Sequence, residues 1–362
     1  MPEEFGNQTM RHYQTFLLRH GQRSNQQSNS MPLWDLLPKY GVPRNQQAAL
    51  RDERGDLPVL EQRFEYLGQR YSLYVEAARV MRADGLREDV YPSEREQLVE
   101  SALRYLASQH PRGFYTINTN AEAPVAGVVF SVHEIRQLLA KRGRHLTYRD
   151  IRESLYVMLR CYIEVDTADR TASFGGPIIT GVQRVAATNG ETVDGDNALW
   201  RVVFNSHISQ AIAQCEYRQF DFDQMVRCKA ALSRWLYLAL VHRWRNASPV
   251  HPLRTSLQEV ARDSGFLGQG QVRKAASKLD KALDELKRVG VLRDYDREEQ
   301  RGSKNKLLDV KYTFHATPAF SGQVIDAHLR EKRSDERDLR RRNERGASKG
   351  IFGQGDGYVW AR

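Results

Sequence analysis

The 362-residue sequence predicts an α+β protein, mainly α, in which one arrangement of helices and strands occurs twice in tandem. Apolar residues recur at helical spacing through much of the chain, alternating apolar runs follow pairs of helices, and polar segments flank the whole. At roughly 150 residues per domain, the length also favours two domains with extensions. We expect a flexible N-terminal arm over 1–56, folded units over 57–215 and 216–325, and a charged, basic C-terminal tail over 326–362.

The clearest helix signals lie between residues 255 and 290. Ser256 is followed three residues later by Glu259, a pattern that caps a helix start. Gly265 can end that short helix in a left-handed conformation. After a Gly-rich turn at 266–270, apolar residues at helical spacing predict a second helix that ends at Gly290: Val272, Ala275, Ala276, Leu279, Ala282, Leu283, Leu286 and Val289.

This second helix should carry its cations on the side away from its apolar face, because residues advance by about 100° each along a helix. A strand at 291–295, a loop at 297–306 and an alternating strand at 308–314 should follow. Helix, turn, helix and hairpin in this order are typical of a winged helix, whose second helix enters the DNA major groove. We assign to a DNA-binding surface Gln271, Arg273, Lys274, Ser277, Lys278, Lys281, Arg301, Lys304 and Lys306. The alternative is a solvated basic hairpin beside an ordinary amphipathic helix.

The overall charge agrees with a polyanionic partner. The net charge is +10 and the isoelectric point is near 9.5, although a basic balance does not by itself distinguish nucleic acid from a membrane surface. No apolar run is long enough to span a bilayer and the N-terminus has no signal-peptide pattern, so we expect a cytoplasmic protein without membrane contact. Cys161, Cys215 and Cys228 have no metal-ligand spacing and are expected as buried free thiols.

One apolar island interrupts the polar N-terminal arm. It runs from Met31 to Pro38, and the surrounding sequence is polar, so it offers no apolar residues for the island to pack against. Such islands are often short motifs that fold onto a partner, and we assign Met31, Leu33 and Trp34 to partner binding. The rival interpretation is that these side chains pack on the chain's own first unit.

Between residues 57 and 109 the spacing favours two helices. The first would contain Leu60, Phe64, Leu67, Tyr71, Tyr74 and Val75 on one side. The second would begin at Ser93, with Glu96 completing a capping box. We interpret both as packing helices rather than as parts of a site.

The order seen at 255–314 occurs earlier in the chain as well. A strand at 125–130 is followed by helices that begin at Ser131 and Thr147, each with a capping carboxylate three residues on. Strands at 163–166, 178–185 and 199–204 follow, with a loop at 167–177 and a turn-rich stretch at 189–196. Between the two units, 222–244 is expected as one long helix that begins the second unit.

Motifs for catalysis are not apparent in the sequence. There is no His-x-His pair to hold a metal beside a nicking tyrosine and no phosphate-binding Gly-x-x-x-x-Gly-Lys-Ser/Thr loop. We therefore expect no cofactor, no metal and no enzymatic activity, with an unfamiliar active site from distant residues as the alternative.

These residues resemble the plasmid replication initiators of the Rep superfamily, including the TrfA and iteron-binding RepA and RepC types. The resemblance covers roughly Pro92 to Phe320 and is carried in the second unit by 230–237, 257–265, 273–286 and Gly290-Val291. In the first unit it is carried by 130–185 and 205–208. It implies two winged helices, the second reading a repeated site in double-stranded DNA and the first linked to dimerisation and backbone contact.

The island is similar to the Gln-Leu-Ser-Leu-Phe-Asp motif by which some initiators hold the replicative sliding clamp, but Ser30 stands in place of Gln. The resemblance thus implies a plasmid replication initiator that binds origin repeats and recruits host proteins, among them the clamp, a helicase or the host initiator. A homodimer is a further expectation. The runner-up is a sequence-specific winged-helix transcriptional regulator, and a nicking enzyme or primase comes third.

Overall fold

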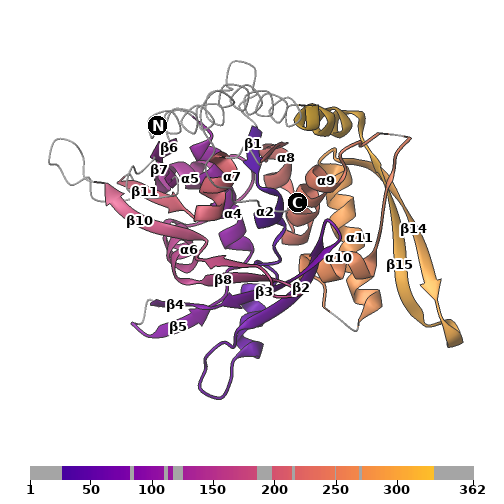
Figure 1. Cartoon of the computed structure of the whole chain (residues 1–362), viewed down its shortest axis with the longest axis horizontal. Coiled ribbons are helices and arrows are strands. Elements are labelled where there is room, and N and C mark those ends of the chain that lie inside the picture. The colour runs from indigo at the N-terminus through magenta and orange to yellow at the C-terminus, as the bar shows by residue number, and fades with distance from the viewer. Residues whose placement is uncertain are drawn as a thin grey trace, which may run out of the picture.

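The computed structural model describes residues 27–81, 85–109, 113–116, 125–185, 198–213, 217–248, 250–268 and 271–329. Figure 1 shows how the described helices and strands are arranged. Buried side chains from both halves of the chain form one continuous hydrophobic core. The described helices are α2 (Pro32–Leu36), α3 (Arg44–Gln47), α4 (Glu94–Ala107), α5 (Val132–Ala140), α6 (Tyr148–Arg160), α7 (Ser206–Ala213), α8 (Phe222–Arg227), α9 (Ala231–Arg243), α10 (Leu257–Ser264), α11 (Val272–Arg288) and a helix over 318–329. Short 3-10 turns occur at η2 (Ala48–Leu50) and η3 (Ser303–Asn305).

The described strands form antiparallel sheets. One four-stranded sheet has the order β10 (Ile179–Val185), β11 (Leu199–Phe204), β7 (Val125–Ser131), β6 (Gly113–Thr116). A second has the order β2 (Leu60–Tyr66), β3 (Gln69–Glu76), β8 (Tyr162–Thr167), β9 (Ser173–Gly176). A three-stranded sheet has the order β13 (Leu253–Ser256), β15 (Leu307–Ala316), β14 (Leu292–Arg301). The pairs β1 (Gln27–Ser30) with β12 (Arg218–Asp221) and β4 (Ala78–Met81) with β5 (Arg87–Val90) complete the set.

The N-terminal segment from residue 27 onward is part of the folded core, so the expectation of a flexible arm is wrong for 27–56. Strand β1 pairs with β12, and the island after it forms α2. Met31 and Trp34 are 2% and 3% exposed, while Leu33 is half-buried. The rival interpretation, that the island packs on its own chain, therefore describes the structure. Residues 1–26 lie outside the described part.

Polar groups of α4 explain why the island is buried. The Trp34 indole donates to the Glu100 carboxylate at 2.8 Å, and the Lys39 ammonium donates to the Trp34 carbonyl at 2.6 Å. Asp35 pairs with Arg104 one helical turn further along α4. A buried charge is stable only when it is paired, and Lys39 also lies 3.8 Å from the Glu100 carboxylate, so each of these charges has a partner of opposite sign. Because the partners are far away in the sequence, local polarity around the island did not reveal them.

The stretch predicted as a first packing helix at 60–76 is instead the hairpin β2–β3. Leu67 and Gly68 form its turn, with φ values of 50° and 80°. Leu73 and Val75 alternate on the buried face of β3, and Phe64 stacks on Tyr71 across the two strands at 5.2 Å. The spacing of the apolar residues fits both a helix and the alternating pattern of a strand. This stretch forms strands because β3 pairs with β8, which lies far away in the sequence.

The predicted long helix at 222–244 is broken into α8 and α9. Residues 228–230 between them are extended, which leaves carbonyl groups without helical partners. The buried guanidinium of Arg234 donates to the carbonyls of Cys228 and Lys229 at 3.1 and 2.8 Å. Nearly every residue of α9 is buried, so the helix runs through the interior rather than along the surface.

The order of elements predicted twice is present twice, but strand pairing differs. In the second unit β13, before the helices, joins the hairpin β14–β15 in one sheet. In the first unit β7 pairs with β11, while β8 and β9, after the helices, join the β2–β3 hairpin. The four capping boxes expected at Ser93, Ser131, Thr147 and Ser256 are all confirmed. The turn-rich stretch at 189–196 lies outside the described residues.

Candidate nucleic-acid interface

Helix α10 and the turn after it set the position of α11. Ser256 accepts the Glu259 amide at 3.2 Å and Glu259 accepts the Ser256 amide at 2.9 Å, which fixes the start of α10. Gly265 ends it with φ 68°, in the left-handed region. Gly41 approaches Gly265 so closely that a Cβ at residue 41 would lie 2.6 Å from the Gly265 carbonyl oxygen. Phe266 is buried in the turn, whereas 269–270 lie outside the described residues.

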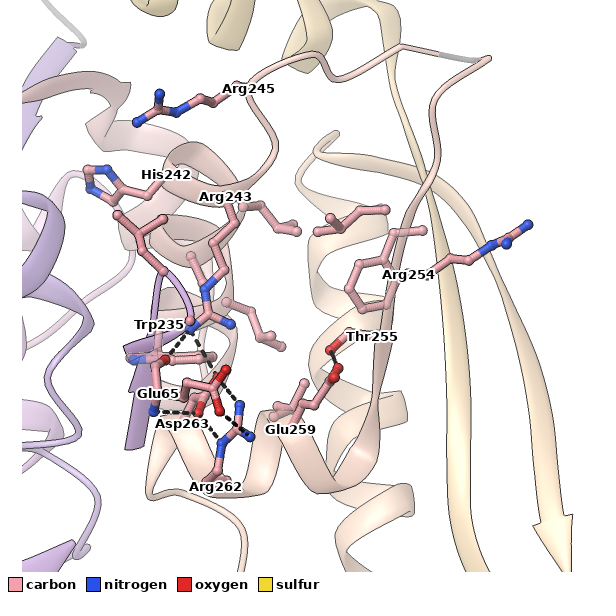
Figure 2. A pocket seen from close by; sticks show the side chains of 18 residues that line it. Glu65, Trp235, His242, Arg243, Arg245, Arg254, Thr255, Glu259, Arg262 and Asp263 are labelled. Atoms are coloured by element: carbon pink, nitrogen blue, oxygen red, sulfur yellow. Dashed lines mark hydrogen bonds and ion pairs between the residues drawn. The ribbon is translucent and has the colours of Figure 1, made fainter. Parts of the chain in front are cut away.

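Ion pairs join α10 to α9 and β2, and a cavity lies beside these contacts. Asp263 accepts from Arg243 at 3.0 Å and from Arg262 at 2.7 Å, and Arg262 also pairs with Glu65 of β2 at 3.0 Å. Figure 2 shows this cluster at one end of a cavity of about 590 Å³ between α9, α10, β13 and the β2–β3 turn. The rest of its wall is mainly apolar, while the guanidinium of Arg254 points away from it. These contacts anchor α10 to the core.

Helix α11 divides its side chains among three directions. Its buried face consists of Ala275, Ala276, Leu279, Ala282, Leu283 and Leu286. A second side, with Asp280, Asp284 and Lys287, contacts side chains of the β14–β15 hairpin. The exposed residues at its start and along its free side include the predicted ones: Gln271, Arg273, Lys274, Ser277, Lys278 and Lys281.

The carboxylates of α11 are held by tyrosines of the hairpin. The Tyr312 hydroxyl donates to Asp280 at 2.8 Å, and the Tyr295 hydroxyl donates to Asp284 at 3.3 Å. Burial and the neighbouring carboxylates raise the pKa of both tyrosines, that of Tyr295 to about 12. The hydroxyls thus stay protonated and remain donors at neutral pH. Sequence reasoning missed this pairing, although the spacing of the two aspartates, i and i+4 on one helix side, was a signal.

The charge on the free side of α11 is uncompensated. Arg273, Lys274 and Lys281 are exposed and, within the described residues, make no ion pair or side-chain hydrogen bond. Ser277 lies exposed among them. Two acidic residues of the helix, Asp280 and Asp284, bond to the hairpin, and the third, Glu285, accepts from the Ala230 amide. None of them is paired with these three cations, which are presented to solvent.

Lys278 makes a contact within the chain that the sequence did not predict, and its role in DNA binding stays a prediction. Its ammonium donates to the Phe266 carbonyl at 2.8 Å, across the turn that joins α10 to α11. Burial lowers the pKa of Lys278 from its usual value. The side chain therefore braces the turn, and one of its three N–H donors is used for the Phe266 carbonyl.

The loop of the hairpin is shorter than predicted. Strands β14 and β15 continue to Arg301 and Leu307, so the loop covers 302–306 rather than 297–306. Cross-strand pairing with β15 extends β14 through a polar run that has no apolar alternation to reveal it. Arg301 pairs with Glu299 and donates to Asn305 at 3.2 Å. Lys304, with φ 56°, and Lys306 are exposed and make no ion pair among the described residues.

Other chemistry is sparse in the described part of the chain. No three His, Cys, Asp or Glu side chains there are grouped so that they could hold a metal ion. No helix there combines the length and apolar character that crossing a bilayer requires. Cys161 and Cys228 are free and buried, as expected, and burial raises the pKa of each thiol to about 12. Cys215 lies outside the described residues.

The fold and the surface together define a protein with a helix–turn–helix and hairpin unit that carries an uncompensated basic face. No protein-family model and no curated protein sequence matches the chain. Solved structures similar to it include two of domains 2 and 3 of RctB, with TM-scores of 0.46 and 0.43 at 12% and 11% identity. The first match covers 76% of this chain and 99% of the RctB chain, and the second covers 75% and 96%.

A third similar structure is that of the Pi initiator protein in complex with iteron DNA. It has a TM-score of 0.37 at 12% identity, and the match covers 67% of this chain and 98% of that one. An initiator is thus among the structures similar to the chain, in line with the resemblance seen in the sequence. At these scores the likeness carries no argument about function, which rests on the geometry above.

Proposed function

We propose that this protein is a plasmid replication initiator that binds double-stranded DNA at repeated sites of an origin. In this proposal α10, α11 and the β13–β15–β14 sheet act as a winged helix. The observation that carries it is the free side of α11, where Arg273, Lys274 and Lys281 are exposed without anionic partners. A cationic helix side of this kind is suited to a duplex, whose phosphates supply most of the affinity.

The arrangement suggests how a duplex would be held. Arg273 and Lys274 lie in the first turn of α11, the part of such a helix that contacts base edges in the major groove. Ser277 and Lys281 continue the same side for one and two turns. The short loop with Lys304 and Lys306 would follow phosphates, which positions the protein without reading sequence.

The proposed role is one of binding rather than catalysis. Repeated sites would collect several copies of the protein at the origin, and the assembly would recruit host replication proteins. The tyrosine–aspartate pairs support the binding role, because they bond Asp280 and Asp284, two of the three acidic residues of α11, to the hairpin.

A footprint on the candidate origin of the native plasmid tests the proposal. We expect protection of several direct repeats, lost when Arg273, Lys274 and Lys281 are all changed to Ala. A matched control changes the same number of exposed arginines elsewhere, Arg63, Arg70 and Arg170, and should keep the footprint. Protection of a single inverted repeat over a promoter would favour a transcriptional regulator instead, and an unchanged footprint of the α11 variant would refute the assigned surface.

A further inference from the structure

A second surface of interest is a groove of about 560 Å³ between α6 and β4, far in the sequence from α11. It is lined by Val80, Met81, Arg149, Arg152, Glu153, Tyr156 and Arg160. In Figure 1 the β4–β5 hairpin lies beside α6 at the opposite side of the molecule from β14 and β15. A ligand in this groove would therefore not compete directly with DNA on α11.

The centre of the groove is apolar and open. Met81 is 62% exposed and Tyr156 is 40% exposed, although both are large side chains. Val80, which also lines the groove, is buried. Methionine, tyrosine and arginine are enriched in protein interfaces, where an apolar centre is surrounded by polar and charged side chains.

The rim of the groove is cationic and has no free carboxylate of its own. Arg149 is exposed and makes no ion pair or side-chain hydrogen bond among the described residues. Arg160 lies over the Tyr156 ring at 5.5 Å and donates to the Arg79 carbonyl at 3.1 Å. Glu153 is the acidic residue in the lining, and it is already bound by Arg44 and by Arg95, the latter at 2.9 Å. The groove thus offers positive charge around an apolar centre.

We propose that this groove binds an acidic peptide segment of a partner protein, with one large apolar side chain of the peptide inserted between Met81 and Tyr156. Carboxylates beside that anchor would pair with Arg149 and Arg160, where charge-assisted bonds to guanidinium groups are strong and directional. The long, unbranched Met81 side chain can adjust its shape to an aromatic or aliphatic anchor.

Two other occupants fit the groove less well. A DNA backbone would satisfy the arginines, but it would leave Met81 and Tyr156 against phosphates and sugars. A second copy of the chain in a two-fold contact would bring the same patch onto itself, because such interfaces are isologous. Arg149 and Arg160 would then face arginines, which opposes association.

Fluorescence anisotropy with the full chain tests the proposal. The probe is a short fluorescein-labelled peptide of glutamates around one phenylalanine, and the control peptide has serine in place of the phenylalanine. We expect the first peptide to bind and the control peptide to bind weakly. Met81→Ser and Arg149→Glu should each weaken binding by roughly tenfold or more, the effect of losing an interface hot spot. Arg245→Glu, a charge reversal on an exposed residue outside the groove, should leave the affinity unchanged.

Binding of the origin duplex, measured in parallel, separates this proposal from the one above, since both groove variants should retain it. Several results would contradict peptide binding in the groove. Both peptides could bind with equal affinity, or the Met81→Ser variant could still bind the phenylalanine peptide as tightly as the parent protein does. Loss of duplex binding in Arg149→Glu but not in Met81→Ser would assign the surface to phosphates. A dimer that dissociates on Met81→Ser would assign it to self-association.

Discussion

Replacing Lys278 with Met separates bracing of the turn from contact with DNA. Methionine keeps most of the length and apolar stem of lysine but cannot donate to the Phe266 carbonyl, now 2.8 Å from the ammonium. A hydrogen bond from a charged group contributes about 1.5–3 kcal/mol when buried. Because this bond is only partly buried, we expect the free energy of unfolding to fall by about 1–1.5 kcal/mol.

The matched variant is Lys281→Met, which removes an exposed cation one turn further along α11. It should change the free energy of unfolding by less than about 0.5 kcal/mol, as is usual for an exposed site. Its effect should lie in DNA binding, where losing one phosphate contact lowers the slope of log affinity against log salt by about 0.9. Lys278→Met should leave that slope unchanged.

Urea denaturation and binding titrations over a range of salt concentrations measure both quantities on the same preparations. The reasoning is refuted if Lys278→Met is as stable as the parent protein and lowers the salt slope by about 0.9. In that outcome Lys278 contacts phosphate, as its position in the sequence predicts, and the bond to Phe266 has no energetic weight.

Further predictions concern three other places. Burial lowers the pKa of His242 to about 3, so the unfolded state takes up a proton first as pH falls. The free energy of unfolding should therefore fall below about pH 6.5, by up to ~1.4 kcal/mol per pH unit, and His242→Gln should flatten this dependence in urea titrations. Changing Lys304 and Lys306 to Ala should lower the salt slope of DNA binding by up to about 1.8, and an unchanged slope would place the loop away from DNA. Gly41→Ala should lower the free energy of unfolding by about 1–3 kcal/mol in the same denaturation assay, because its Cβ would clash with the Gly265 carbonyl, and a neutral effect would contradict that contact.

The second unit was predictable because its signals are local. A capping box at Ser256 and a left-handed glycine at Gly265 fix the ends of α10, and seventeen residues of regular apolar spacing define α11. The cationic side of α11 follows from the same spacing. Such features depend on backbone groups within one or two turns, so the sequence around them is enough.

Features that depend on distant partners were not predictable in this way. The β2–β3 hairpin is selected by β8, some ninety residues later, and the island around Trp34 is buried by Glu100 of α4. The contact of Lys278 with the turn likewise depends on a partner that the helical pattern does not include. Angular position on a helix places Lys278 among the cations that are predicted to face DNA, but it cannot reveal that the turn carbonyl of Phe266 lies within reach.

The hairpin affects the charge of α11 as much as the helix's own residues do. Asp280 and Asp284 would lie next to the cationic side of the helix if they were free, since one helical position turns by about 100°. The hydroxyls of Tyr312 and Tyr295 donate to Asp280 and Asp284, so both carboxylates are bonded to the hairpin. In the proposed winged helix, the sheet would therefore do more than add a DNA contact. The sheet engages two of the three carboxylates of α11, and Arg273, Lys274 and Lys281 are left without an acidic partner among the described residues.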